Sequence, residues 1–147
     1  MPELHELRYS ECEALLRAGV TGRVAFVEDG GRPVIVPVNY AVVGNAIVIR
    51  TSPYSLLGTH ARNTPMAFEV DQFDYVNHRG WSVLARGTSK VIKHEDEIEE
   101  VRRVWEPQPW AGGSRSMWVR LRWDDLTGRR LGEGWDPLQG TPVRRSL

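Results

Sequence analysis

The chain has 147 residues, and its 19 basic and 19 acidic side chains give a formal net charge of zero at pH 7. This length fits one domain that buries a core without a disulfide or metal staple, and 41% hydrophobic residues argue against disorder. Zero net charge argues against a protein that coats nucleic acids, because such binding needs surplus Lys and Arg to displace counterions.

The first part of the chain predicts one helix followed by antiparallel strands. Ser10 and Glu13 have the spacing of a capping box, and Gly19 is placed to end the helix. The hydrophobic pattern then changes to strands joined by tight glycine-containing turns, which are too short for parallel crossovers. The predicted helix spans about residues 10–18, and the predicted strands span 22–28, 33–43 and 46–51.

Pro37 stands in the middle of the predicted strand 33–43. Proline has no N–H to donate to a strand ladder, so it is unusual there. It indicates a sheet edge, a bulge, or a place where something other than a neighbouring strand meets the backbone.

The second half continues the β pattern. Gly87 inside a long strand predicts a bulge or bend, and five acidic residues between positions 95 and 100 suit the positive end of a helix. In chain order we predict a helix through about residue 62, strands 66–71 and 80–92, a helix from 95, a loop 107–114, a strand 117–123, a turn at 124–125, a short strand 126–131 and an irregular tail 134–147.

Six to seven antiparallel strands with only a few helices predict a mainly β fold, a closed or nearly closed β-barrel. We find no linker or repeat that would divide the chain. The expected organisation is a single domain over residues 1–147, with its core at about 10–132.

The cysteine content and the N-terminal residues indicate which covalent links and which cell compartment to expect. Cys12 is the single cysteine, so no intrachain disulfide forms, and its place on an apolar stripe predicts a core residue rather than a nucleophile. The N-terminal residues lack a signal-peptide pattern, and no apolar run reaches the roughly 18 residues of a membrane helix. We expect a cytoplasmic protein with neither membrane nor nucleic acid as a partner.

Local motifs for catalysis and metal binding are missing from the sequence. It contains no GxSxG, HExxH, P-loop or GxGxxG pattern in a fitting context. The four histidines share no metal-ligand spacing, so we predict no metal site from the sequence.

Arg50, Thr51 and Ser55 bring a cation and two hydroxyls to the point where a predicted strand runs into a helix. That combination suits a phosphate, because the free N–H groups of a helix start add to the side-chain donors. Hydroxyl residues at this position also serve as plain helix caps. The residues alone leave both interpretations open.

The order of short motifs resembles the pyridoxamine 5′-phosphate oxidase-like flavoproteins, the FMN-binding split β-barrel group, and in particular their small actinobacterial-type members. The matching segments are residues 22–26, 33–40, 49–51, 65–71, 80–87 and 127–130. The resemblance implies a homodimer of split barrels with FMN at the dimer interface. It also implies an FMN-binding oxidoreductase that acts on a small-molecule substrate, which the sequence does not identify.

In such proteins the proline-containing strand lies along the flavin ring, and the phosphate binds where the following strand ends. The resemblance therefore implies ten cofactor-binding residues and no identified catalytic residue. They are Pro37, Val38, Asn39, Arg50, Thr51, Ser55, Trp81, Ser82, Trp118 and Arg129.

This sequence departs from the family pattern in the phosphate loop. Members that hold FMN tightly usually carry Lys or Arg just after the serine, where this chain has Leu56 and Leu57. Two alternatives therefore stay open beside the FMN oxidoreductase: a non-catalytic module that binds or senses a flavin or deazaflavin, and a cofactor-free dimeric split barrel.

Overall fold

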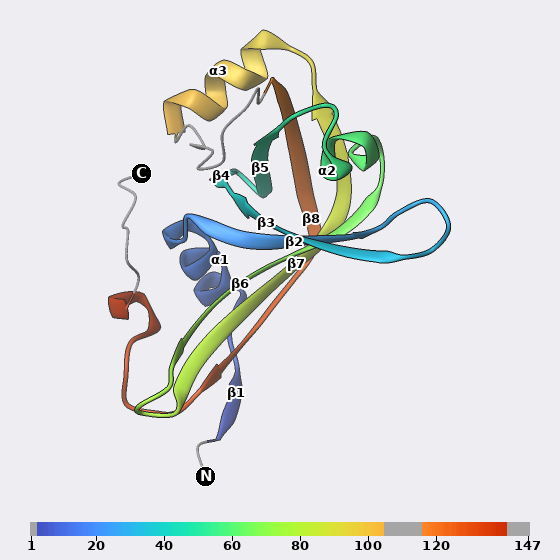
Figure 1. The fold of residues 1–147 in the computed structure, drawn as a ribbon. Coiled ribbons are helices and arrows are strands. Elements are labelled where there is room, and N and C mark those ends of the chain that lie inside the picture. The colour runs from blue at the N-terminus through green and yellow to red at the C-terminus, as the bar shows by residue number, and fades with distance from the viewer. Residues whose placement is uncertain (1–2, 105–115, 141–147) are drawn as a thin grey trace.

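The computed structural model describes residues 3–104 and 116–140 (Figure 1). The expected loop 107–114 and the tail beyond residue 140 lie outside the described residues. The helices are α1 (Tyr9–Ala18), α2 (Leu56–His60), α3 (Glu95–Val104) and the 3-10 helix η1 (Pro137–Gly140). The strands are β1 (Leu4–Glu6), β2 (Thr21–Val27), β3 (Pro33–Asn39), β4 (Ala41–Val43), β5 (Ala46–Thr51), β6 (Pro65–Asp74), β7 (Arg79–Ile92) and β8 (Met117–Leu131).

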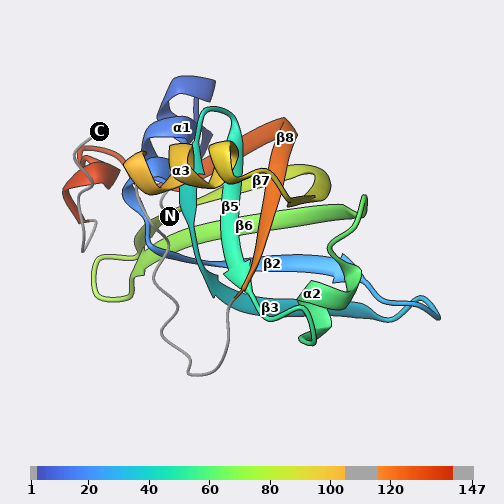
Figure 2. The ribbon, with the colours of Figure 1, turned by 90° about the horizontal axis from the view of Figure 1, so that it is seen from above.

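The strands form one antiparallel sheet in the order β3-β2-β6-β7-β8-β5-β4, and β1 pairs with β8. β3 and β4 lie at opposite ends of this order, although only Tyr40 separates them in the chain. The sheet must therefore curl until its two ends approach each other, as Figures 1 and 2 show. This confirms the predicted mainly β, split-barrel architecture.

Tyr40 fixes the corner where the chain passes from one end of the sheet to the other. The buried Tyr40 hydroxyl donates a hydrogen bond of 2.6 Å to the carbonyl oxygen of Leu16 in α1. A Cβ on Gly19 would collide with the same hydroxyl, which explains why a glycine ends α1 there. The expected single strand 33–43 is therefore wrong, because the corner at Tyr40 divides it into β3 and β4.

The main core fills the inner side of the curled sheet. Cys12 and Leu16 of α1 pack there, together with alternating side chains of β6 such as Phe68. The prediction that Cys12 is a core residue is confirmed, and burial raises the pKa of its thiol. The same alternation directs the intervening residues of β2, β6 and β7 to the outer face of the sheet.

Among the described helices, α3 covers one end of the outer face, and the other end has no helix over it. α3 packs through Val101 against Val48, Ile92 and Trp118, which form a second, smaller core over β5 and β8 (Figure 2). At the other end, the hairpin of β2 and β3 leaves Ile35 69% exposed and Val27 56% exposed. A bare, partly apolar sheet face therefore remains among the described elements.

The start of α1 differs from the prediction by one position. The helix begins at Tyr9, and the Glu11 carboxylate accepts a hydrogen bond of 3.1 Å from the backbone N–H of Arg8. The expected capping box of Ser10 and Glu13 is wrong, because the residue three positions beyond the cap is Glu11. The end of the helix at Ala18 agrees with the prediction.

The expected turn at Asp124 and Asp125 is a β-bulge within a continuous β8. Gly87 pairs with Trp123 and Arg86 pairs with Asp125, so Asp124 is the extra residue. A Cβ on Gly87 would collide with the carbonyl oxygen of Arg122, which is why this position is a glycine. The bulge predicted at Gly87 is thus confirmed, and the separate strand 126–131 is the second half of β8.

Pro37 lies in β3, an end strand of the sheet in the described structure, so the sheet-edge interpretation is confirmed. β1 was not predicted, because three residues carry too little pattern to detect. None of the helices in residues 3–104 and 116–140 has the length and apolar character needed to cross a membrane.

Candidate functional site

The residues implied to bind the cofactor fall in four places: the loop from β5 to α2, the small core under α3, the main core, and the outer face of the sheet. Thr51 is 4% exposed, and its hydroxyl lies 2.8 Å from that of Ser55. The Ser55 hydroxyl donates to the carbonyl oxygen of Ser52 and accepts from the N–H of Gly58. Both hydroxyls are thus engaged within the loop, and Ser55 is the N-cap of α2.

Arg50 points away from this pair of hydroxyls. Neighbouring residues of a strand face opposite sides of the sheet, and the Arg50 guanidinium carbon lies 4.8 Å from the ring centre of Trp118, its partner in β8. Trp118 is 5% exposed and is also contacted by the guanidinium of Arg102, at 5.5 Å. The structure brings Arg50 to Trp118, and does not gather Arg50, Thr51 and Ser55 around one point.

The two leucines of the phosphate loop have different environments. Leu57 is 3% exposed and belongs to the main core. Leu56 is 43% exposed beside Ser55. The chain therefore uses position 57 for packing, and only position 56 is open to solvent.

The remaining residues divide between the two faces of the sheet. Val38 packs on the main core, and the indole of Trp81 is 3% exposed within it. The Trp81 indole N–H is buried and has no hydrogen-bond partner among the described residues. These two side chains face the interior, opposite to the bare outer surface.

Pro37, Asn39, Ser82 and Arg129 lie on the outer face. Ser82 stands directly opposite Arg129 in the pairing of β7 with β8. The Asn39 amide donates a hydrogen bond of 3.0 Å to the Thr21 hydroxyl across β2 and β3. Their position on an accessible face is compatible with ligand contacts, and their binding of a cofactor stays a prediction.

A charged cluster on the same outer face was not predicted from the sequence. One guanidinium nitrogen of Arg23 lies 3.0 Å from a Glu69 carboxylate oxygen and 3.4 Å from one of Asp71. Burial, together with a hydrogen bond that the protonated Glu69 carboxyl donates to the neighbouring carboxylate of Asp71, raises the pKa of Glu69 to about 7, although Arg23 opposes the rise. The alternation in β6 indicated the outward direction of Glu69, but its partial burial depends on distant Arg23 and on the curl of the sheet.

A cavity of about 540 Å³ opens at the hairpin end of β2 and β3. This volume is within the usual range for small-molecule sites. Its described lining includes none of the ten residues implied by the resemblance. Apolar side chains on the outer face line much of it, namely Ala25, Val27, Pro33, Ile35 and Ala67, and the lining also includes Thr88, Arg86 and Asp124.

Comparisons with known proteins agree with this architecture. An uncharacterized protein of Mycobacterium tuberculosis is 27% identical over 134 residues, which cover 88% of this chain and 86% of that protein. The structure of the FAD binding protein from Mycobacterium smegmatis is 29% identical, with a TM-score of 0.72, and the match covers 86% of this chain and 97% of that one. A structure from Corynebacterium glutamicum is also 29% identical, with a TM-score of 0.75 and coverage of 92% and 98%.

A family model described as pyridoxamine 5′-phosphate oxidase matches residues 9–130. The matched region contains α1 to α3 and nearly all of the sheet except β1. This chain therefore belongs to the pyridoxamine 5′-phosphate oxidase family of split-barrel proteins.

Proposed function

We propose that this protein is a flavin-dependent oxidoreductase that holds FMN at the interface of a homodimer and acts on a small-molecule substrate. The observation that carries the flavin in this proposal is the similarity, over 86% of this chain, to a Mycobacterium smegmatis protein named for its FAD binding, whereas FMN as the nucleotide rests on the resemblance of the sequence motifs. When bound, a flavin would supply the hydride chemistry, and the protein would bind and orient it. The cytoplasmic location expected from the sequence stays a prediction.

The edge of the sheet supports a place for a flavin ring. β3 has a strand neighbour on one side only in the described structure, so half of its backbone hydrogen-bonding groups face away from the ladder. Pro37 has no N–H to contribute on this strand. A planar ring with polar atoms along one edge and apolar faces fits such a strand beside the apolar cavity at its hairpin end.

The bare outer face supports the dimer. Ile35 and Val27 are more than half exposed on adjacent strands, and the charged cluster of Arg23, Glu69 and Asp71 lies next to them. Exposed apolar side chains that gather on one face are typical of interaction surfaces. A second copy of this chain over β2, β3 and β6 would remove them from water, with a cofactor at the margin.

A second candidate is that FAD, rather than FMN, is the nucleotide. The specific observation is the ligand in the printed name of the Mycobacterium smegmatis relative. In this chain the hydroxyls of Thr51 and Ser55 are engaged within the loop, and Leu56 and Leu57 carry no charge toward a terminal phosphate. An adenosine diphosphate extension would add contacts that do not depend on this loop.

The proposal is tested by titrating cofactor-free protein separately with FMN, FAD and a deazaflavin, with flavin fluorescence as the readout. Tighter binding of FMN than of FAD supports the proposal, and the reverse order replaces FMN with FAD. Bound flavin that neither NADH, NADPH nor a reduced deazaflavin can reduce would indicate a binding module without turnover. A stable monomer in sedimentation would contradict the interface site.

Arg50→Ala tests whether the cation over Trp118 contacts the nucleotide. Loss of a charge-assisted hydrogen bond to phosphate costs about 1.5–3 kcal/mol, which is roughly a tenfold to hundredfold weaker affinity. Arg122→Ala removes an exposed arginine from β8 that is not among the candidate site residues, and it serves as the control. Equal affinity of the Arg50→Ala variant and the unchanged protein would remove Arg50 from the site.

A further inference from the structure

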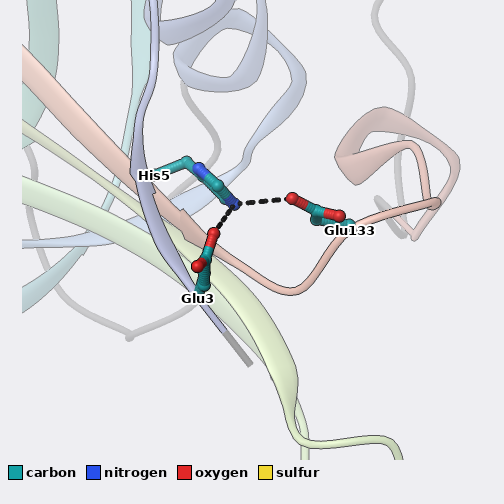
Figure 3. A group of neighbouring side chains, drawn as sticks. All are labelled: Glu3, His5 and Glu133. Carbon is teal, nitrogen blue, oxygen red and sulfur yellow. Dashed lines mark ion pairs between the residues drawn. The ribbon is translucent and has the colours of Figure 1, made fainter. Parts of the chain in front are cut away.

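One imidazole and two carboxylates meet at the exposed end of β1. Figure 3 shows the His5 ring between the side chains of Glu3 and Glu133. The Nε2 atom of His5 lies 3.2 Å from a carboxylate oxygen of Glu133 and 3.8 Å from one of Glu3. All three atoms lie within 4.8 Å of one another.

The backbone holds the segments that carry these side chains. His5 pairs with Arg130 in the β1–β8 ladder, and the N–H of Gly132 donates a hydrogen bond of 3.2 Å to the carbonyl oxygen of Glu3. Gly132 and Gly134 flank Glu133 with φ values of +92° and +74°, a conformation that glycine adopts without strain. The glycine turn thus returns Glu133 toward β1, which makes the arrangement a property of the fold.

The donor atoms of the cluster favour a positive charge at its centre. A neutral imidazole nitrogen and two carboxylate oxygens present only electron pairs to the space between them. His5 Nε2 is itself buried and makes no hydrogen bond within the described residues. A metal ion between the three atoms would accept these electron pairs.

The spacing of the ligand atoms of Glu3, His5 and Glu133 favours a transition-metal ion of the zinc type. In a tetrahedral zinc site with ligands at about 2.0–2.1 Å, neighbouring ligand atoms are about 3.3 Å apart. The distances of 3.2 and 3.8 Å from His5 Nε2 are close to that value and need only small side-chain movements. An imidazole ligand suits zinc and related transition metals, whereas magnesium and calcium prefer oxygen ligands alone.

We propose that Glu3, His5 and Glu133 form a binding site for a divalent transition-metal ion of the zinc type, with water at the remaining position. The side chains of Glu3 and Glu133 are 77% and 73% exposed, so an ion can enter and keep a water ligand. Because His5 and Glu133 lie at opposite ends of the sequence, no local spacing could reveal the site.

The test is calorimetric titration of the tag-free protein with Zn²⁺, and separately with Mg²⁺, at pH 7.5. We expect one saturable Zn²⁺ site per chain, much weaker Mg²⁺ binding, and at least about tenfold weaker Zn²⁺ affinity in both His5→Ala and Glu133→Gln. His78→Asn removes an exposed imidazole from the β6–β7 turn and tolerates its φ of +52°, so it serves as the matched control.

Co²⁺ gives a second readout, because its visible absorption reports bound nitrogen and oxygen ligands directly. The spectrum of bound Co²⁺ should be present in the His78→Asn control and absent in His5→Ala. Circular dichroism in EDTA checks that the variants fold. The proposal is overturned if the protein shows no saturable Zn²⁺ binding, or if both site variants bind Zn²⁺ as the unchanged protein does, in which case His5 is an ion-pair partner only.

Discussion

Replacement of Glu69 by glutamine should stabilise this protein at alkaline pH. The pKa of the Glu69 carboxyl is raised from 4.5 to about 7, chiefly by burial and secondly by the neighbouring carboxyl of Asp71. A glutamine side chain has the same shape and can still accept from Arg23 through its amide oxygen. It removes the charge that burial and Asp71 make unfavourable.

The sign and size of the effect follow from proton linkage. Because the folded protein holds the Glu69 proton more tightly than the unfolded chain, this contribution to stability is complete below about pH 4.5 and is lost as the pH rises through about 7. The full pKa difference corresponds to about 3 kcal/mol. The Glu69 side chain is 34% exposed, so solvent screening reduces our expectation to about 1–2 kcal/mol.

Urea unfolding at pH 5.5 and pH 8.5 measures the difference in unfolding free energy between the Glu69→Gln variant and the unchanged protein. We expect the Glu69→Gln variant to exceed the unchanged protein by about 1–2 kcal/mol in unfolding free energy at pH 8.5, and by less at pH 5.5. Glu100→Gln, which removes an exposed carboxylate from α3, should show no such pH-dependent gain. A Glu69→Gln variant that is less stable than the unchanged protein at pH 8.5 would refute the reasoning.

Three further predictions concern positions where the structure assigns a specific role. Gly87→Val should lower the unfolding free energy by more than about 2 kcal/mol or prevent folding, because its side chain would collide with the backbone of β8 at the bulge; thermal unfolding of purified protein checks this. Leu57→Ala should lower the unfolding free energy by about 2–4 kcal/mol in urea unfolding, because Leu57 is buried in the main core. Leu56→Arg should leave the unfolding free energy within about 0.5 kcal/mol of the unchanged protein and should tighten FMN binding up to about tenfold in a fluorescence titration. Tyr40→Phe should cost about 1–2 kcal/mol in urea unfolding, because the carbonyl of Leu16 loses its buried hydroxyl donor, and an unchanged midpoint would contradict that role.

Most of the fold could be predicted from local pattern. Alternation marked the strands, Pro37 indicated a sheet edge, and Gly87 indicated the bulge. The division of the strand at Tyr40 could not be predicted, because residues 33–43 are locally suited to one continuous strand. Only the pairing of β3 and β4 with different neighbours reveals the corner.

The turn predicted at Asp124 and Asp125 is wrong because the same residue types suit more than one structure. Adjacent aspartates suit a turn, yet Asp124 occupies a bulge whose partner strand lies far away in the chain. For the candidate site, the period of a strand implies that Arg50 and Thr51 face opposite sides of the sheet, as the structure shows, and their contact with a phosphate stays a prediction. The partial burial of Glu69 could not be predicted, because it depends on Arg23 and on the curl of the sheet. Neither is visible in a short stretch of sequence around Glu69.

The binding of a flavin is central to the proposed function. The visible absorption spectrum of the purified protein tests flavin binding directly. We predict absorbance bands of an oxidised flavin, either as purified or after incubation with FMN and removal of the excess. Mass spectrometry of the released ligand should then identify FMN. A protein that stays colourless and takes up neither FMN, FAD nor a deazaflavin would contradict the central claim.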